Sequence, residues 1–294
     1  MKNVKKYLNT IDKNISKWLE NNLDYFDFDN VIYKEKSIDD KFKPFCELCF
    51  LSNFLIKNSE FYIKINKLID NKIKSYSWDD LLIRNSSLFP ALIYIDSFNI
   101  DMHKKSVFDE SLPSFFSYLN LRAPYRMLEI YTYIYLYYKS KSNNNIEEIL
   151  KKTILGKKKN INLLNYMDIY SITHELFYIH LLIKNNNLIS IYFDKEKKFI
   201  KSYLLGIITF INLEGHFDLL IELILCLALF DFKFSYDEIF VIEKSLENIL
   251  QNTKKSGGII PHKKYNKKID IDFFDLYHTT SVAKGMVDAW KKKL

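Results

Sequence analysis

Residues that interrupt regular structure are scarce in this chain of 294 residues, which contains only six glycines and five prolines. Folds built from many short strands need frequent tight turns, and such turns favour glycine and proline. Their scarcity over this length therefore favours long helices. Because 48% of the residues are hydrophobic, the chain can bury a sizeable core. We predict an all-α fold in a single helical domain over residues 1–294, with a separate N-terminal helical subdomain over residues 1–110 as the alternative.

Cysteine is also scarce, and no apolar run is long. Cys46, Cys49 and Cys226 provide no disulfide framework, which fits a reducing compartment. Cys46 and Cys49 have the spacing of a zinc-binding pair, but there is no second pair, so we interpret them as core residues. The most apolar stretch, 219–230, is shorter than the ~20 residues that span a bilayer. We therefore expect a cytoplasmic protein without a membrane partner.

The formal net charge of +7 comes from lysines that are spread along the chain, with short runs at 157–159 and 291–293. A domain that binds nucleic acid usually gathers its basic residues on one face. We therefore expect no nucleic-acid partner and interpret the basic runs as solvated surface. The sequence also lacks a Walker loop, a Gly-x-Ser-x-Gly elbow and a His-Glu-x-x-His motif.

Apolar residues recur at helical spacing along most of the chain, and Pro44 and Pro124 suit the first turn of a helix. The predicted helices cover residues 1–26, 42–57, 58–73, 78–88, 113–121, 124–138, 146–155, 171–183, 194–213, 216–230, 236–254 and 277–294. Polar starts near residues 122, 174, 216 and 278 recur every ~40–60 residues, a period expected of helical-hairpin repeats. Such hairpins stack into a solenoid or close into a ring, and we predict a small or incomplete α/α toroid.

Five of the six histidines lie in the second half of the chain, and three of them stand in short polar clusters beside apolar helical stretches. These three are His174, His216 and His278. We predict that each lies at the start of a helix and points into one shared site.

A metal site is the first candidate. Asp218 and Glu222 are four residues apart and share one helix face. His216 joins them only if it lies in the preceding turn, which Gly215 permits. Together with His278, such nitrogen and oxygen donors with an open position would make a catalytic zinc or iron site. The alternative is a helix-capping Asp218 beside a buried, hydrogen-bonded histidine.

The remaining candidates are catalytic or substrate-binding residues. His278 and His174 are candidates for proton transfer, or else a cap and a core histidine. Thr279 is expected to orient His278 or bind substrate. Arg122 and Arg126 flank Pro124 and would bind an anionic substrate, although Arg126 can instead pair with Glu129. His262 follows a loop with two glycines and a proline that would cover the site, or it is an exposed loop residue.

The segment Gly257-Gly258-Ile259-Ile260-Pro261, then Asp275 and Tyr277-His278-Thr279-Thr280, resembles the last repeat of the protein prenyltransferase β subunit. That family is an α/α toroid, and its histidine in this motif is a zinc ligand, which implies the same role for His278. Its Asp-x-Cys motif is not matched, because this chain has His216-Phe217-Asp218 at the comparable place. The resemblance covers about 30 residues and implies architecture more than activity.

The chain also looks like bacterial helical proteins of unknown function with Thr-His-x-x-Phe, Gly-His-x-Asp-Leu-x-x-Glu and Tyr-His-Thr-Thr signatures. The matching residues begin at Thr173, Gly215 and Tyr277. This resemblance implies a shared fold and site but supplies no reaction.

We therefore hold two functional hypotheses. The first is an enzyme that acts on a small molecule or peptide in a biosynthetic pathway. Its metal ligands would be His216, Asp218 and His278, its catalytic residues His174, His278 and Glu222, and its substrate-binding residues Arg122, Arg126, Thr279 and His262. The alternative is a non-catalytic helical protein that holds a peptide or an apolar ligand.

Overall fold

The computed structural model describes residues 1–75, 123–138 and 146–294. Within these ranges the chain forms eleven α-helices, four short 3-10 helices and no strand, with one isolated antiparallel bridge between Thr253 and Ile259. The all-α prediction is confirmed for this part of the chain. The helices predicted at 78–88 and 113–121, and the candidate Arg122, lie outside the described residues.

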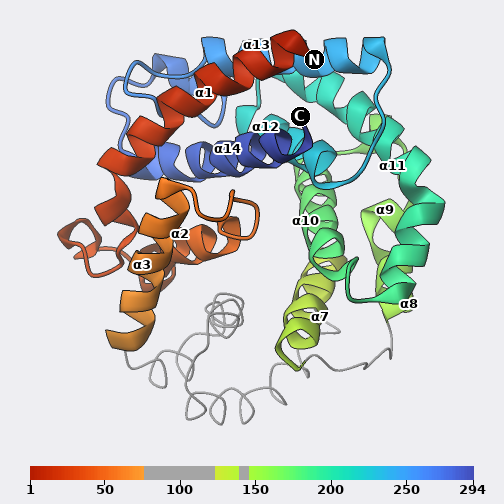
Figure 1. The fold of residues 1–294 in the computed structure, drawn as a ribbon, viewed down its shortest axis with the longest axis horizontal. Helices are drawn as coiled ribbons and strands as arrows, with labels where there is room; N and C mark the ends of the chain where they lie inside the picture. Colours follow the sequence, from red (N-terminus) through yellow and green to blue (C-terminus); the bar gives the residue numbers. More distant parts are fainter. Residues whose placement is uncertain (76–122, 139–145) are drawn as a thin grey trace.

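The helices follow one another as shown in Figure 1. They are α1 (Lys2–Asn21), α2 (Ile38–Leu51), α3 (Glu60–Ser75), α7 (Pro124–Tyr138), α8 (Ile146–Lys152), α9 (Ile154–Lys157), α10 (Tyr166–Leu182), α11 (Asn187–Glu214), α12 (Phe217–Leu229), α13 (Tyr236–Gln251) and α14 (Phe273–Lys293). No described helix has both the length and the apolar character needed to cross a membrane.

Four predicted helix starts are wrong, because polar residues further upstream cap the helices first. Asn186 caps α11, which therefore begins at Asn187 rather than at the predicted residue 194. Ser37 caps α2, so Pro44 lies inside that helix. A capping box of Asn165 and Asp168 starts α10 before the predicted Ser171. A second box, of Asp272 and Asp275, starts α14. In each box the two side chains satisfy backbone N–H groups that the first turn leaves without partners.

These earlier starts change the place of two candidate histidines. His174 lies in the middle of α10 and His278 lies in the second turn of α14, so neither stands at a helix start. His216 does, because it is the N-cap residue of α12. Gly215 ends α11 in the left-handed conformation, with a φ of 68°. The turn predicted at Gly215 is therefore confirmed.

The helix α12 is the most deeply buried element of the described chain. All of its residues from Leu219 to Ala228 are buried. Figure 1 shows α12 and α14 in the interior, with α1, α13 and α11 around them. Gly285 of α14 lets the two helices and α2 approach closely, since a Cβ atom there would lie 2.6 Å from Leu51 Cδ1 and 3.8 Å from Leu225 Cδ2. Trp290 also donates a hydrogen bond to the carbonyl of Ile224.

Five helices run in the same direction, namely α2, α7, α10, α12 and α14. For each neighbouring pair, a residue later in one helix contacts a residue later in the other. The pairs are Tyr125–Tyr170 and Tyr135–Asn185 between α7 and α10; Thr173–Glu222 and His180–Phe230 between α10 and α12; His278–Glu222 and Lys293–Phe230 between α14 and α12; and Glu47–His278 and Ile56–Asp288 between α2 and α14.

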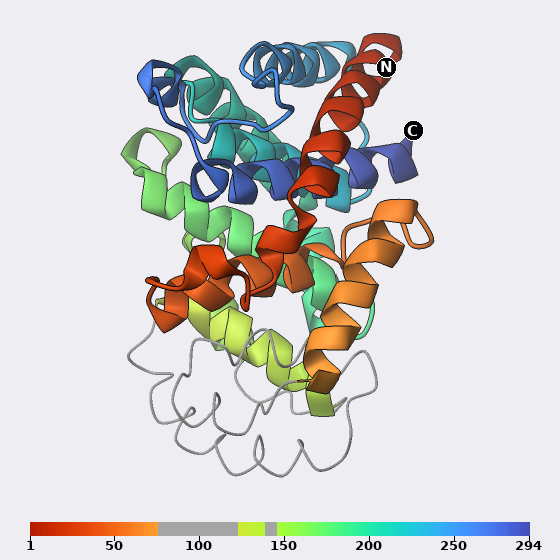
Figure 2. The same ribbon diagram turned by 90° about the vertical axis from the view of Figure 1, so that its left-hand side faces the viewer.

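The helix α1 crosses α14 in the opposite sense, as Figure 2 shows. Asp12 pairs with Lys284, whereas the later Trp18 stacks on the earlier Phe273. The helices α11 and α13 run parallel to each other, and so do α13 and α1. The described chain thus has an inner set of helices and an outer set that runs the other way.

Gly257 provides a test of how the loop before α14 packs on α1. Its φ is 99°, and a Cβ atom would lie 2.1 Å from the carbonyl oxygen of Asn14. We expect Gly257→Ala to lower the free energy of unfolding by more than ~1 kcal/mol, because both the backbone conformation and the space forbid a side chain. Chemical denaturation measures this loss. The control is Gly206→Ala, within α11, where only the flexible end of Ile161 is near and a change within ~1 kcal/mol is expected. Equal effects of the two substitutions would contradict this packing.

Glu175 provides a test of the interior of α10. Its buried carboxylate accepts hydrogen bonds from the backbone N–H groups of Ile154 and Leu155 at the start of α9. Burial raises the pKa of Glu175 from 4.5 to about 7. The folded protein therefore holds this proton more tightly than the unfolded chain does, so stability from this group is full below its unfolded pKa and falls as the pH rises from 4.5 to about 7.

We expect the wild-type protein to lose more stability between about pH 5 and about pH 8 than the Glu175→Gln variant does, by up to ~3 kcal/mol. Denaturation of both proteins at the two pH values gives the difference directly. Parallel pH dependences of the two proteins would show that Glu175 titrates as it does in the unfolded chain.

Candidate metal centre

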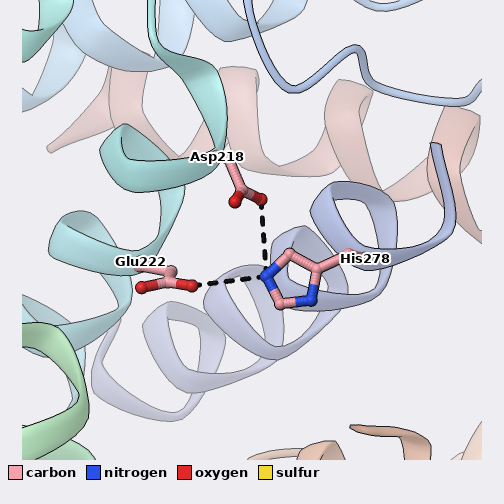
Figure 3. Close-up of side chains that lie close together, drawn as sticks. All are labelled: Asp218, Glu222 and His278. Atoms are coloured by element: carbon pink, nitrogen blue, oxygen red, sulfur yellow. Dashed lines mark hydrogen bonds and ion pairs between the residues drawn. The ribbon is translucent and has the colours of Figure 1, made fainter. Parts of the chain in front are cut away.

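The imidazole of His278 lies among three carboxylates. Its Nδ1 is 2.9 Å from Glu47 Oε2. On the other side of the ring, Nε2 is 3.4 Å from Glu222 Oε1 and 3.5 Å from Asp218 Oδ1. Figure 3 shows Asp218 and Glu222 pointing toward Nε2 from α12, with the ring projecting from α14. Both ring nitrogens of His278 are thus engaged by carboxylates.

Local sequence explains why the two carboxylates of α12 lie together. Asp218 and Glu222 are separated by one helical turn, and α12 begins directly before them at the N-cap His216. The loop before α14 fixes this end of the helix, because the Asp218 backbone N–H donates to the carbonyl of Pro261 at 3.1 Å. Thr279, which follows His278, donates its hydroxyl hydrogen to Asp218 Oδ1 at 2.8 Å. Asp218 is therefore held in place from α14 as well as from α12.

Glu222 is the most buried member of the group, with only 1% of its side chain exposed. It stands in an otherwise apolar stretch of α12. A buried carboxylate is costly unless its oxygens are hydrogen-bonded and its charge is compensated. Here His278 faces one oxygen, and the hydroxyl of Thr173 from α10 donates to the other. Glu222 therefore joins α10, α12 and α14.

The proximity of opposite charges shifts the pKa values of the group. Burial alone would lower the pKa of His278, but the carboxylates of Asp218, Glu47 and Glu222 raise it well above its usual value. Burial would raise the pKa of Glu222, but the hydrogen bonds from His278 and Thr173 lower it. The pKa of Asp218 is raised by burial and by the charge of Glu222, against the effect of His278. These shifts favour a protonated His278 ring that the surrounding carboxylates share as a partner.

Asp218, Glu222 and His278 form a group with the donor atoms of a metal site. One atom from each residue lies within 4.8 Å of the others. Tetrahedral zinc with bonds of ~2.0–2.1 Å places neighbouring donor atoms ~3.3 Å apart, close to the two distances measured from Nε2. Glu47 on Nδ1 occupies the place of the outer carboxylate that orients a metal-binding histidine.

His216, a predicted ligand, lies outside this three-residue group. Its Nδ1 is an acceptor for the Leu219 backbone N–H at 3.5 Å. Its ring lies 5.1 Å from the ring of Tyr166 and 5.4 Å from that of His262. His262 in turn caps the short helix that begins at Lys263, by accepting from the Lys264 N–H. The two histidines therefore meet at the turn before α12.

His174 lies beside the group. Its Nδ1 donates to the carbonyl of Tyr170 at 2.9 Å and is 3.9 Å from Glu222 Oε2. Burial lowers the pKa of His174, which keeps the ring neutral. Arg126, at the start of α7, pairs with Glu129 at 2.6 Å, as the alternative interpretation of that residue expects.

Two residues of the site were not predicted as part of it, namely Glu47 and Thr173. Glu47 lies between Cys46 and Cys49 in α2, and the chain returns to it only after 231 residues, at His278. A carboxylate inside the apolar stretch 45–51 was the one signal that sequence offered. Thr173 was named as part of the Thr-His-x-x-Phe signature, but it lies inside α10 and its hydroxyl donates to Glu222.

The chain that carries this site matches one protein family. The profile of one protein family, a domain of unknown function (DUF6895), matches residues 13–287. The chain belongs to this family. Glu47, Asp218, Glu222 and His278 all lie within the matched residues. No curated protein and no solved structure matches the chain. Membership of a family of unknown function is thus confirmed, whereas the likeness to the prenyltransferase β subunit and the three signatures stay predictions.

The hydrogen bond from Thr173 to Glu222 can be tested by its effect on stability. We expect Thr173→Val, which keeps the shape of the side chain, to lower the free energy of unfolding by ~1–3 kcal/mol, because a buried carboxylate loses a donor. Urea denaturation measures the loss. Thr209→Val in α11 is the matched control, since that exposed hydroxyl bonds only within its own helix. A loss no larger than that of the control would mean that Glu222 does not depend on Thr173.

Proposed function

We propose that this protein is a metal-dependent enzyme in which Asp218, Glu222 and His278 hold one divalent ion. The observation that carries the proposal is the convergence of their donor atoms within 4.8 Å at a buried position. Solvent-exposed acidic groups often cluster without binding an ion, but Glu222 is almost fully enclosed by apolar helices.

The balance of charge around His278 supports the same proposal. Three carboxylates, those of Glu47, Asp218 and Glu222, surround one imidazole. Lys43 lies 3.8 Å from Glu47 Oε1, but this lysine is largely exposed. One imidazolium offsets only one of the three negative charges. A divalent cation bound at Nε2 would replace the ring proton there and offset two of the three charges, in a region where uncompensated charge is costly.

The donor set favours zinc or iron. Imidazole nitrogen suits both ions, and carboxylate oxygen completes the coordination of either. In this arrangement Glu47 accepts the Nδ1 proton of His278 and leaves Nε2 free to bind. His278 is 28% exposed, whereas Glu222 is not accessible, so water or a substrate would approach from the side of His278. When bound, such an ion activates water or polarises a carbonyl group.

The arrangement of the helices supports the wider prediction of a small or incomplete α/α toroid. In that architecture the inner helices run in parallel and the outer helices return in the opposite direction, as the two sets described above do. Glu47, His174, Asp218, Glu222 and His278 all belong to the inner set. We propose that a small molecule or peptide binds at the end of these helices where Asp218 and Arg126 lie, with His174 and Thr279 beside it.

Metal analysis tests the proposal. Protein purified without a polyhistidine tag, stripped with a chelator and titrated with zinc or ferrous iron, is expected to bind one equivalent. Calorimetry and elemental analysis should both report the loss of this ion in His278→Ala and in Asp218→Asn. Glu47→Ala is expected to weaken binding by roughly 10–100-fold, because the ring loses the group that orients it. Glu47→Gln keeps an oxygen acceptor for Nδ1 and should weaken binding less.

His262→Ala is the control, since this histidine lies outside the three-residue group. It should bind the ion as the wild-type protein does. Circular dichroism establishes that each variant is folded. A folded wild-type protein that binds no ion, or a His278→Ala variant that binds it unchanged, would overturn the metal assignment and favour a metal-free histidine site or a binding protein.

A further inference from the structure

Side chains from α7 and α10 form an aromatic surface beside the metal group. Tyr170 and His174 are one helical turn apart on α10, and their rings lie 3.9 Å apart. The ring of Tyr125, from the start of α7, lies 6.1 Å from that of Tyr170 and 6.0 Å from that of His174. The guanidinium of Arg126 lies 5.1 Å from the Tyr125 ring centre. The ring of Tyr125 thus lies between Arg126 and the pair Tyr170 and His174.

The hydroxyl of Tyr170 lies between opposite charges. Burial raises its pKa, the carboxylates of Glu222 and Glu47 raise it further, and Arg126 opposes them. Charges of both signs therefore act on this one hydroxyl group. Within the part of the chain that the structure describes, the hydroxyl makes no hydrogen bond. The residue is only partly buried, so the hydroxyl is accessible to a ligand that supplies an oxygen acceptor.

Arg126 has hydrogen-bonding capacity left. One of its nitrogens, Nη1, pairs with Glu129, while 41% of the side chain remains exposed. A guanidinium carries five N–H donors in a planar fork that matches a carboxylate. Glu129 occupies part of that fork, and the rest is open to a second carboxylate. The pairing with Glu129 also holds the guanidinium in place, which lowers the entropy cost of binding.

We infer that Arg126 and the hydroxyl of Tyr170 bind the carboxylate of a small acid whose flat or apolar body packs on Tyr125 and His174. A single negative charge fits this site better than a phosphate, because Glu129, Glu222 and Glu47 would repel a dianion. The inference deepens the proposed function by naming its substrate class, and it rests on that function only for the reaction that follows binding. The carboxylate contacts themselves need no metal ion.

Binding of benzoate to the metal-free protein tests this inference. Benzamide has the same shape without the charge and serves as the matched ligand. By calorimetry we expect benzoate to bind the wild-type protein roughly tenfold more tightly than benzamide, as expected for charged hydrogen bonds. Phenylphosphonate, a dianion at higher pH, should bind more weakly than benzoate.

The variants separate a binding role from a structural one. Arg126→Lys keeps the charge beside Glu129 but loses the fork, so it should weaken benzoate and leave benzamide unchanged. The double variant Arg126→Gln, Glu129→Gln removes both charges of this ion pair and should bind the two ligands equally. Tyr170→Phe should weaken benzoate severalfold. Tyr166→Phe, at the exposed start of α10, is the matched control and should have no effect.

The outcomes that would overturn the inference are equally specific. The inference is wrong if the double variant binds benzoate as tightly as the wild-type protein does. It is also wrong if benzamide or phenylphosphonate binds at least as tightly as benzoate. Finally, it is wrong if the folded wild-type protein binds no benzoate at millimolar concentration. Because these titrations contain no metal, a failure of the metal assignment leaves them interpretable. Conversely, the Arg126 variants should still take up metal, so a failure here would leave the metal centre intact.

Discussion

The burial of one carboxylate, that of Glu222, determines how the centre of this protein is arranged. Placing an ionised group in a helix that is otherwise apolar costs several kcal/mol unless other groups compensate it. The compensation comes from two other helices, through the hydroxyl of Thr173 and the ring of His278. His278 in turn needs Glu47 on its far side. Four helices must therefore lie in one register before any of these groups is satisfied.

Packing away from the site enforces that register. Gly285 brings α14 close to α12 and α2, and Gly257 lets the loop before α14 lie on α1. A second ionic group, in which Lys284 contacts both Asp12 and Asp288, ties α14 to α1. Asp288 also accepts a hydrogen bond from the Ile56 N–H, in the connection that follows α2. The position of α14, which carries His278, is thus fixed along its whole length.

The features that could be predicted from the sequence are those that depend on residues close together in the chain. The pairing of Asp218 with Glu222 follows from helical spacing, and the left-handed turn follows from Gly215. The segment from Pro124 to Tyr138 was predicted as a helix with the observed bounds, in spite of its alternating tyrosines. The late starts given to α10 and α14 were errors of interpretation, since both capping boxes are visible in the sequence.

The part that could not be predicted depends on contacts between distant segments. Nothing near Glu47 indicates that its partner is His278, and nothing near Thr173 indicates that its hydroxyl reaches Glu222 as well as the Tyr170 carbonyl of its own helix. The position of His216 outside the three-residue group also depends on contacts between distant segments. Its ring is turned toward Tyr166 and His262 by the loop packed on the start of α12. Only the tertiary arrangement determines which histidine reaches the carboxylates.

The separation of Glu47 and His278 by 231 residues has a consequence for synthesis of the chain. Ribosomes add roughly 5–20 residues per second, so Glu47 emerges on the order of ten to fifty seconds before the residue that compensates it. During that interval α2 carries an acidic side chain on a face that will later be enclosed. Its water-exposed carboxylate discourages premature burial of that face, and α14, which is made 231 residues later, then closes the core over it. The site is therefore assembled only after α14 has been synthesised, by the contact that joins α2 to α14.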